Sequence, residues 1–320
     1  MVALHIVSAE EGAGKTTIGV SVGKRLLSDG KKVGFLKPAG RNGDATFMKQ
    51  VLGLTESADS LCPPVAKLGE TVTRIAGGKD VIISEGSGGS DESGLAVPAV
   101  PGARVIIVGS FSGQSSSSQF LKMGKAFGEN LLGVVLNKVP KSQLKRLTEE
   151  LSAELEAAGI RLLGVLPEDR TLLSLTVAEL ADAVQGKILN SAERSAELVE
   201  NLMVGAMSVD SGLDYFGRKP NKAVVVQDNR PDMQMAALET SVRCLVVSGE
   251  VTPIEYVRYK AEDRGVPIIL TQSDTSAIVA SIEDALGQTR FNQEKKLTRV
   301  AEIAGQNLDF PAIYQGLGLG

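Results

Sequence analysis

The segment from Val2 to Arg25 constrains the fold of this chain more than any other part of the sequence. An apolar run from Val2 to Val7 predicts a buried strand, and a glycine-containing loop from Ala9 to Gly14 follows it. Lys15 then opens a segment in which apolar residues recur with helical spacing. A strand, a short glycine loop and a helix in this order are the setting in which phosphate-binding loops work. The sequence therefore predicts an anion site at the start of the helix.

The physical basis of this prediction is local. Backbone N–H groups of the loop and of the first helical turn are expected to converge where the positive end of the helix dipole lies. Gly12 and Gly14 let the chain approach phosphate oxygens, Lys15 adds a point charge, and the Thr16 hydroxyl is a candidate ligand of Mg²⁺. The strict pattern has glycine where this chain has Ala9. An ordinary turn is the alternative, which the preceding buried strand disfavours. The residues expected to contact a nucleotide are Glu11, Gly12, Ala13, Gly14, Lys15, Thr16 and Thr17.

Composition limits the class of protein. A length of 320 residues favours two domains, and 43% hydrophobic residues are typical of a globular chain. No apolar run reaches the roughly 18 to 20 residues of a membrane span, and the start does not resemble a signal peptide. The net charge of -4 and the absence of Trp argue against nucleic-acid binding. We therefore expect no membrane and no nucleic-acid partner.

Cysteine and histidine are too few for the usual metal and acid–base sites. Cys62 and Cys244 lie far apart in the sequence and form no metal or disulfide pattern, which favours the reducing cytoplasm. The single histidine, His5, lies in the middle of the first predicted strand. We interpret it as a structural residue rather than a catalytic or zinc-binding one.

Polar residues follow several later apolar strands, where ligands bind in doubly wound sheets. Lys37 ends the strand from Lys32 to Leu36 and faces that crevice. Asp44, shortly after it, is either a helix cap or a metal or substrate ligand. Glu85 follows the strand from Val81 to Ser84 and is placed to hold Mg²⁺ directly or through water, with an exposed loop acid as the alternative. Asn137 ends the strand from Leu131 to Leu136 and can bond the edge of a purine base.

Strands and helices alternate up to about Gly186, which predicts a parallel α/β sheet with helical crossovers. The polar stretch from Asn190 to Glu200 is the best candidate boundary, and a second, smaller α/β unit follows it. We expect a nucleotide-binding domain over 1–188, a second domain over 189–288 and a C-terminal tail over 289–320 that forms an arm or partner contact.

The second predicted unit has polar residues beyond its strand ends as well. Asp228, Arg230 and Asp232 follow one strand, and Asp274 and Thr275 follow another. They indicate either a small-ligand pocket or a capping turn before a helix.

Two family resemblances rest on these motifs. The first domain resembles dethiobiotin synthetase and its cobyrinic-acid amidating relatives among the P-loop ATPases, through the elements E-E-G-A-G-K-T-T, L-K-P, G-D-A, E-G-S-G-G, V-V-L-N-K and L-G-V-L-P-E-D-R. The second part, with Q-D-N-R-P-D-M-Q and G-V-P-I-I-L-T-Q-S-D-T, resembles a DRTGG domain. The two together are similar to the N-terminal region of long-form phosphate acetyltransferases.

The first resemblance implies roles for individual residues. It implies that Lys15 and Lys37 hold phosphate or an activated acid, and that Asn137 reads adenine. It also implies that Thr16, Asp44 and Glu85 surround Mg²⁺. Relatives of this domain pair across the ATP site, which implies a homodimer.

Three departures limit the transfer of function. The loop after the Lys-Pro strand end is longer in dethiobiotin synthetases, and here it is shortened to Ala39-Gly40. The segment F-S-G-Q-S-S-S-S does not match the substrate region of that family. Glu10 stands where the related partition-type ATPases have a lysine. In the long-form phosphate acetyltransferases the acetyl-transferring domain lies further along the chain than the similar region, so we do not carry transferase activity over to this sequence.

The sequence thus predicts a protein that binds ATP and Mg²⁺ and works as a regulatory module with slow or no hydrolysis. The alternative is an ATP-dependent ligase acting on a small carboxylate or amine. In that reaction a substrate carboxylate or carbamate, held by Lys37, attacks the γ-phosphorus and displaces ADP, and an amine later displaces phosphate from the resulting acyl phosphate.

Overall fold

The computed structural model describes residues 1–8, 10–38, 42–86, 102–112, 117–206, 212–289 and 291–319. The chain forms two compact units. Unit 1 contains Met1–Asp169 together with Phe291–Gly320, and unit 2 contains Arg170–Arg290. Unit 2 is therefore a continuous stretch of sequence between the two segments of unit 1.

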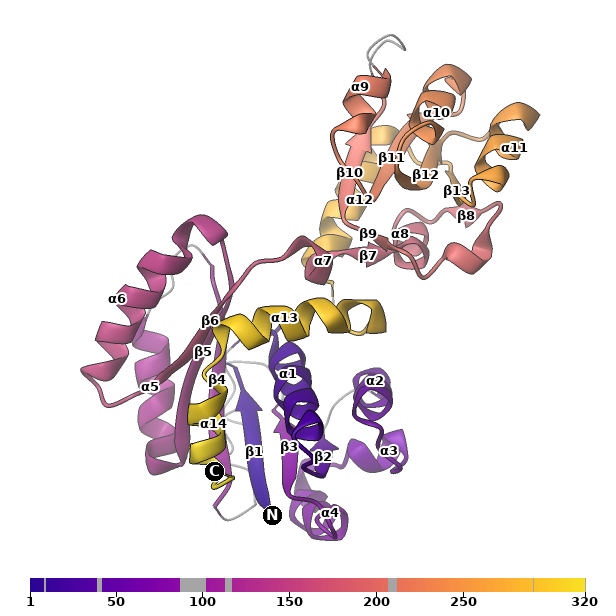
Figure 1. The fold of residues 1–320 in the computed structure, drawn as a ribbon. Helices are drawn as coiled ribbons and strands as arrows, with labels where there is room; N and C mark the ends of the chain where they lie inside the picture. Colours follow the sequence, from indigo (N-terminus) through magenta and orange to yellow (C-terminus); the bar gives the residue numbers. More distant parts are fainter. Residues whose placement is uncertain are drawn as a thin grey trace. The chain divides into compact units, whose positions relative to one another are not determined.

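Unit 1 is built on a six-stranded parallel sheet (Figure 1). The apolar runs of the sequence form its strands, and their residues are buried on both faces because helices cover both sides. In spatial order the strands are β2 (Val33–Leu36), β3 (Val81–Glu85), β1 (Val2–Val7), β4 (Arg104–Ser110), β5 (Leu131–Val139) and β6 (Leu162–Pro167).

The strand order reverses direction beside β1. The connection from β1 to β2 runs one way along the sheet, and the connections from β4 to β5 and β6 run the other way. Right-handed crossovers then place α1 on one face and α5 and α6 on the other, which agrees with Figure 1. The described helices of unit 1 are α1 (Lys15–Ser28), α2 (Asn42–Leu52), α3 (Ala58–Leu61), α4 (Leu68–Ile75), α5 (Ser117–Phe127), α6 (Leu144–Glu156), α13 (Leu297–Asn307) and α14 (Phe310–Gly316).

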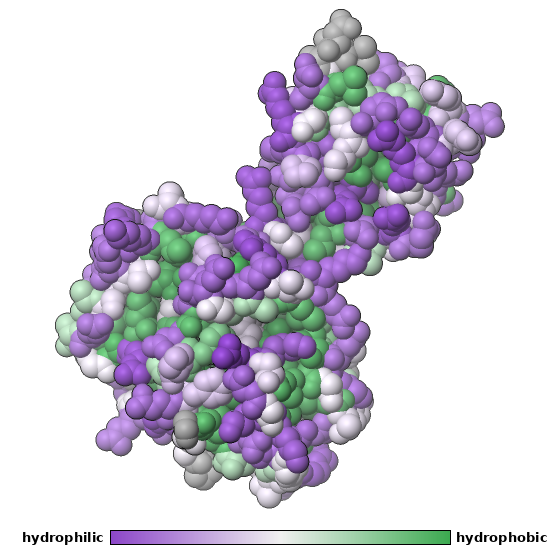
Figure 2. All heavy atoms as spheres, in the orientation of Figure 1, coloured by the Kyte–Doolittle hydropathy of each residue, from purple (hydrophilic) through white to green (hydrophobic). Residues whose placement is uncertain are grey.

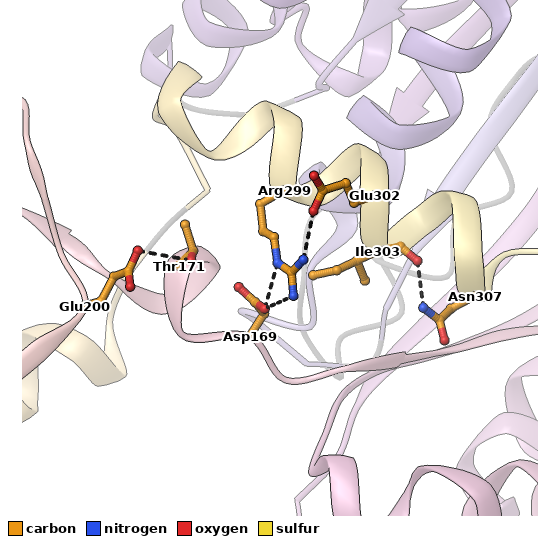
Figure 3. A network of polar contacts seen from close by, with 7 residues as sticks. All are labelled: Asp169, Thr171, Glu200, Arg299, Glu302, Ile303 and Asn307. Carbon is orange, nitrogen blue, oxygen red and sulfur yellow. Dashed lines mark hydrogen bonds and ion pairs between the residues drawn. The ribbon is translucent and has the colours of Figure 1, made fainter. Parts of the chain in front are cut away.

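The C-terminal segment packs against unit 1. Helix α13 contacts both α1 and β6, and Leu308 forms an antiparallel bridge with Gly164 of β6. The Arg299 guanidinium donates from Nε and Nη2 to Oδ2 of Asp169, at 2.9 and 2.8 Å (Figure 3). These contacts differ from the expected arm or partner contact, because the apolar side of α13 is buried within the same chain.

Unit 2 has a smaller sheet in the order β10 (Asn201–Val204), β11 (Lys222–Gln227), β12 (Val242–Ser248), β13 (Ile268–Thr271) and β8 (Lys187–Ile188). The first four strands are parallel, and β8 pairs antiparallel with β13. A separate pair joins β7 (Leu175–Thr176) to β9 (Leu198–Val199). The described helices of unit 2 are α7 (Arg170–Leu173), α8 (Val177–Ala183), α9 (Gly212–Gly217), α10 (Pro231–Leu238), α11 (Glu255–Asp263) and α12 (Thr275–Gly287).

Each face of this smaller sheet has its own apolar core. Val224 and Val226 of β11 pack with α9, α10 and α11 on one face. Ala223 and Val225 alternate with them and pack with α8 and α12 on the other. Both faces are buried, which explains why β11 is a continuous apolar run in the sequence.

The predicted fold class is confirmed: a parallel P-loop-type α/β sheet is followed by a smaller α/β unit. The division by contacts, however, falls after Asp169 rather than after residue 188. The reason is that α8 packs on α12 and β8 pairs with β13, so 170–188 joins unit 2. The polar stretch from Asn190 to Glu200 lies inside unit 2.

The described helices are too short or too polar to serve as membrane spans. Among the described residues, no helix combines the length and the apolar character needed to cross a bilayer. Figure 2 shows one face of the molecule, on which hydrophilic residues are interspersed with smaller hydrophobic areas.

Candidate functional site

The loop between β1 and α1 has the backbone of an anion cradle. Gly12 and Gly14 have φ angles of 72° and 100°, a region that side chains rarely adopt. Gly14 is the N-cap residue of α1, and no side chain caps the helix there. A Cβ atom at Gly14 would lie 2.1 Å from Nδ2 of Asn137, so glycine is required on two grounds. The positive end of α1 is thus left for an external anion.

Lys15 lies beside this cradle. Its ammonium donates to Oγ of Ser8 at 2.7 Å, and the Ser8 hydroxyl donates to the carbonyl of Glu10 at 2.6 Å. Burial lowers the pKa of Lys15, and attraction to Glu85 partly offsets this effect. The hydrogen bond to a neutral hydroxyl leaves most of the positive charge of Lys15 available to an anion.

Four predicted site residues meet at the ends of β2 and β3. Oε2 of Glu85 accepts hydrogen bonds from the Thr16 hydroxyl at 3.0 Å and from the Lys37 ammonium at 3.1 Å. Lys37 also donates to Oδ2 of Asp44 at 2.6 Å. The structure therefore brings Thr16, Lys37, Asp44 and Glu85 into one hydrogen-bonded group, because the parallel strands end at the same edge of the sheet.

Glu85 is fully buried, which excludes the alternative of an exposed loop acid. Its Oε1 atom has no hydrogen-bond partner among the described residues and lies near Gly19, where a Cβ atom would come within 3.1 Å of it. Burial raises the pKa of Glu85, opposed by the charge of Lys37. A buried carboxylate of this kind needs a cation beside it.

Lys37 supplies that cation in this structure. Burial alone would lower its pKa, but the charges of Glu85 and Asp44 outweigh burial and raise it. Asp44 lies in the first turn of α2, which begins at Asn42, so it does not occupy the cap position. Its carboxylate instead forms the ion pair with Lys37.

Asn137 lies under the loop. Its side chain is buried, and Nδ2 donates to the carbonyl of Ala13 at 3.0 Å. This bond holds the loop at Ala13 and uses one N–H of the Asn137 amide. Recognition of adenine by Asn137 stays a prediction. It would use the second N–H and the oxygen of the amide.

Sequence reasoning missed the contact that ties the loop to β4. Oε1 of Glu10 accepts hydrogen bonds from both the backbone N–H and the hydroxyl of Ser110, at 2.6 and 2.8 Å. The signal available in the sequence was a serine at the end of β4, in the same row of strand ends as Lys37 and Glu85. Glu10 is thus bound within its own chain.

The donor set at this site suits a hard divalent cation. The Thr16 hydroxyl and the carboxylates of Asp44 and Glu85 are oxygen ligands of the type that Mg²⁺ prefers. Within the described ranges, no group of three or more His, Cys, Asp or Glu side chains gathers around one point. Phosphate or water oxygens would therefore have to complete the coordination of a cation.

In unit 2 the polar residues predicted beyond the strand ends bond other groups of the same unit. Asp228 accepts from the backbone N–H groups of Glu250 and Val251, both at 3.1 Å. Arg230 pairs with Asp232, and Asp274 caps α12 through the N–H of Ala277. The bond of Asp274 is the helix cap that the second alternative predicts, whereas Asp228 bonds the loop after β12 and no side chain caps α10. The small ligand remains a prediction.

Several predicted elements lie outside the described residues. These are Ala9, the shortened loop at Ala39-Gly40, the glycines after Gly86 and residues 113–116 of the serine-rich segment. A cleft of about 650 Å³ lies elsewhere in unit 1, and Arg161, Asp309 and Gln315 are among its lining residues. It lies where β6 begins, so it does not include the loop residues.

Comparison with protein families matches both parts of the chain. The model described as "CobQ/CobB/MinD/ParA nucleotide binding domain" matches residues 4–179, which is more than half of the chain. The DRTGG domain model matches residues 179–285. The resemblance seen in the sequence, a P-loop ATPase domain followed by a DRTGG domain, is confirmed by these two matches.

Curated relatives include phosphate acetyltransferases. That of Pseudomonas aeruginosa is 23% identical over 96% of this chain and 51% of its own length. That of Synechocystis sp. is 25% identical over 50% of this chain and 24% of its own length. The chain thus spans about half of the first relative and less of the second.

Solved structures with a similar fold include MinD of Aquifex aeolicus in complex with MinC. It is 21% identical with a TM-score of 0.41, covering 54% of this chain and 84% of that one. A nucleotide-binding protein of Archaeoglobus fulgidus in complex with ADP is 17% identical with a TM-score of 0.41, covering 52% and 82%. The match over residues 4–179 shows that the chain belongs to the CobQ/CobB/MinD/ParA nucleotide binding domain family, here followed by a DRTGG domain.

Proposed function

We propose that unit 1 binds MgATP at the loop between β1 and α1, and that the protein is a regulatory nucleotide-binding module with slow or no ATP hydrolysis. The observation that carries the proposal is the N-terminus of α1, which begins at a glycine with positive φ and no side-chain cap, next to the Lys15 ammonium. Backbone N–H groups and one ammonium around a single point are the chemistry that recognises a polyphosphate.

Different residues of the chain would bind the phosphates, hold the loop and bind the metal ion. The amides from Glu11 to Thr17 and the ammonium of Lys15 hold phosphate oxygens, and Asn137 keeps the loop in place through Ala13. Thr16, Asp44 and Glu85 would hold Mg²⁺, which supplies charge neutralisation at the phosphates when it is bound. The charge of Lys37 interacts with that of Lys15, so Lys37 could contact the same anion.

The regulatory role is supported by the order of the two domains. A nucleotide domain followed by a DRTGG domain matches about half the length of a phosphate acetyltransferase, so the acetyl-transfer activity of such relatives is not assigned to these residues. A regulatory module requires that a nucleotide bind two conformations of the protein with different affinity.

A second candidate is an ATP-dependent ligase. The observation that favours it is Lys37, whose ammonium lies at a strand end beside the predicted magnesium ligands, where it could hold the oxyanion of a substrate carboxylate. Phosphate release measured with candidate amines, amino acids and ammonia separates the two functions. Strong stimulation by one small acid or amine supports the ligase, and a uniformly slow rate supports the regulatory module.

Titration calorimetry with ATP and MgCl₂ tests the binding proposal. We expect saturable heat for the wild type and a loss of affinity of about tenfold or more for Lys15→Met, because an ammonium–phosphate bond is charge-assisted. Lys24→Met is the matched control, since Lys24 is an exposed lysine of the same helix. Absence of heat and of any melting shift in the wild type would overturn the proposal.

The proposal extends to location and partners. We place the protein in the cytoplasm on the basis of its two free thiols, Cys62 and Cys244. We propose a homodimer, in which Glu10 takes no part because it bonds Ser110 of its own chain. The small ligand of unit 2 would bind near Arg230. Sedimentation checks the homodimer, and thermal-shift measurements with nucleotides check the ligand of unit 2.

A further inference from the structure

We infer that Lys37 acts as an internal cation that occupies the magnesium site of the nucleotide-free protein and so makes metal binding dependent on nucleotide. This inference rests on the proposed function, and it concerns how that same site is regulated. It starts from two contacts of one ammonium group, to Asp44 at 2.6 Å and to Glu85 at 3.1 Å.

The position of the ammonium is the first argument. Asp44 and Glu85 are the two carboxylates that would hold the metal, and Lys37 Nζ bonds both of them. Thr16 donates to the same Oε2 atom of Glu85 that Lys37 contacts. One oxygen of each carboxylate, Oε2 of Glu85 and Oδ2 of Asp44, is therefore already engaged by hydrogen-bond donors.

The burial of the group is the second argument. The Glu85 side chain is 0% exposed and the Lys37 side chain 15% exposed, so water contributes little to compensating these charges. Removing the ammonium would leave a buried carboxylate with only one hydroxyl donor, which is costly. A metal ion can therefore enter only if the ammonium of Lys37 moves away and finds a new anionic partner.

A bound polyphosphate offers that partner. Lys15 already lies beside the loop, and its ammonium bonds a neutral serine rather than a carboxylate. Lys37, in contrast, has two carboxylates to leave. A phosphate anion would attract Lys37 and free Asp44 and Glu85 at the same moment. Metal and nucleotide would consequently bind with positive coupling, and Mg²⁺ alone would bind weakly.

The test measures Mg²⁺ binding without nucleotide. Melting temperature and titration calorimetry are recorded for the full chain in MgCl₂ and in KCl at matched ionic strength. We expect no specific response from the wild type. Lys37→Met should gain a saturable Mg²⁺-dependent rise in Tm, with affinity about 10-fold to 100-fold tighter than that of the wild type.

Three further variants make the result specific. Lys37→Gln retains an N–H donor for Glu85 and replaces the methionine variant if that one does not fold. Lys24→Met, the matched control, removes an exposed ammonium of α1 and should change Mg²⁺ affinity far less. The double variant Lys37→Met/Glu85→Gln should lose the gained response, because it removes a predicted ligand.

Two outcomes would overturn the inference. One is a wild type that binds Mg²⁺ alone as tightly as the Lys37 variants do, and the other is a folded Lys37 variant that gains no response. A wild type that binds no ATP, with or without Mg²⁺, counts against the proposed function instead. The two failures are distinguishable because the comparison of variants in Mg²⁺ alone involves no nucleotide.

Discussion

Glu10 and Ser110 hold the nucleotide loop to the next strand of the sheet. One carboxylate oxygen of Glu10 accepts two hydrogen bonds from Ser110, although the residues are 100 positions apart. Related partition-type ATPases are expected to have a lysine at the position of Glu10. Here the residue serves its own loop.

We therefore predict that Glu10→Ala destabilises the protein by about 1.5–3 kcal/mol, because two charge-assisted hydrogen bonds are lost. Glu10→Gln should cost less, since the amide oxygen can still accept from Ser110. Urea unfolding followed by circular dichroism measures both values. Equal stability of the alanine and glutamine variants would contradict the role of this contact.

Gly14 should not tolerate a side chain. Gly14→Ala places a Cβ atom 2.1 Å from Asn137 Nδ2 and forces alanine to adopt a φ of 100°. We expect a loss of about 1–3 kcal/mol of stability, together with weaker nucleotide binding. Gly12→Ala is the informative comparison, because its Cβ atom would meet nothing within 4 Å and only the φ of 72° opposes it. A Gly14→Ala variant as stable as Gly12→Ala would contradict the predicted steric clash with Asn137.

His5 should make stability depend on pH. Burial lowers the pKa of His5 from 6.5 to about 4. Between pH 6.5 and pH 4 the imidazole is therefore protonated in the unfolded chain and neutral in the folded one. Stability therefore falls as the pH drops from 6.5 towards 4, by about 2 kcal/mol at pH 5. Because His5 is the single histidine, His5→Leu should remove most of this slope between pH 7 and pH 5. Urea midpoints at these two pH values measure it, and an unchanged slope in the variant would assign the effect to other groups.

Arg299 should stabilise unit 1 through Asp169. The Asp169 side chain is 7% exposed and receives two bonds from the guanidinium, which also donates to Glu302 (Figure 3). Arg299→Met should cost about 1–3 kcal/mol, because it removes two charge-assisted hydrogen bonds to a nearly buried carboxylate. Asp169→Asn with Arg299→Met removes both charges and should restore part of the loss. Glu302→Gln is the exposed control and should change stability by less than about 0.5 kcal/mol. A double variant no more stable than Arg299→Met would contradict the pairing.

Much of unit 1 was predictable because its signals are local. The strand from Val2 to Val7 and the helix that begins at Lys15 lie where periodicity and glycine spacing put them. Continuous apolar runs also located β2, β3 and β5, since strands covered on both faces are apolar throughout. The short strands β7, β8 and β9 of unit 2 have two residues each, too few to leave a periodic pattern.

The sequence by itself placed Lys37 and Glu85 at strand ends and Lys15 and Thr16 at the start of the first helix, and it predicted one site formed by these residues and Asp44. Only the tertiary structure decided how they are paired: Lys37 between two carboxylates, Asn137 under the loop and Glu10 on Ser110. It also decided that the C-terminal helices pack on unit 1. The physical reason is that propensity and periodicity act between near neighbours in the chain. Hydrogen bonds and burial act between residues that the crossovers bring together, and no local pattern encodes that choice of partner.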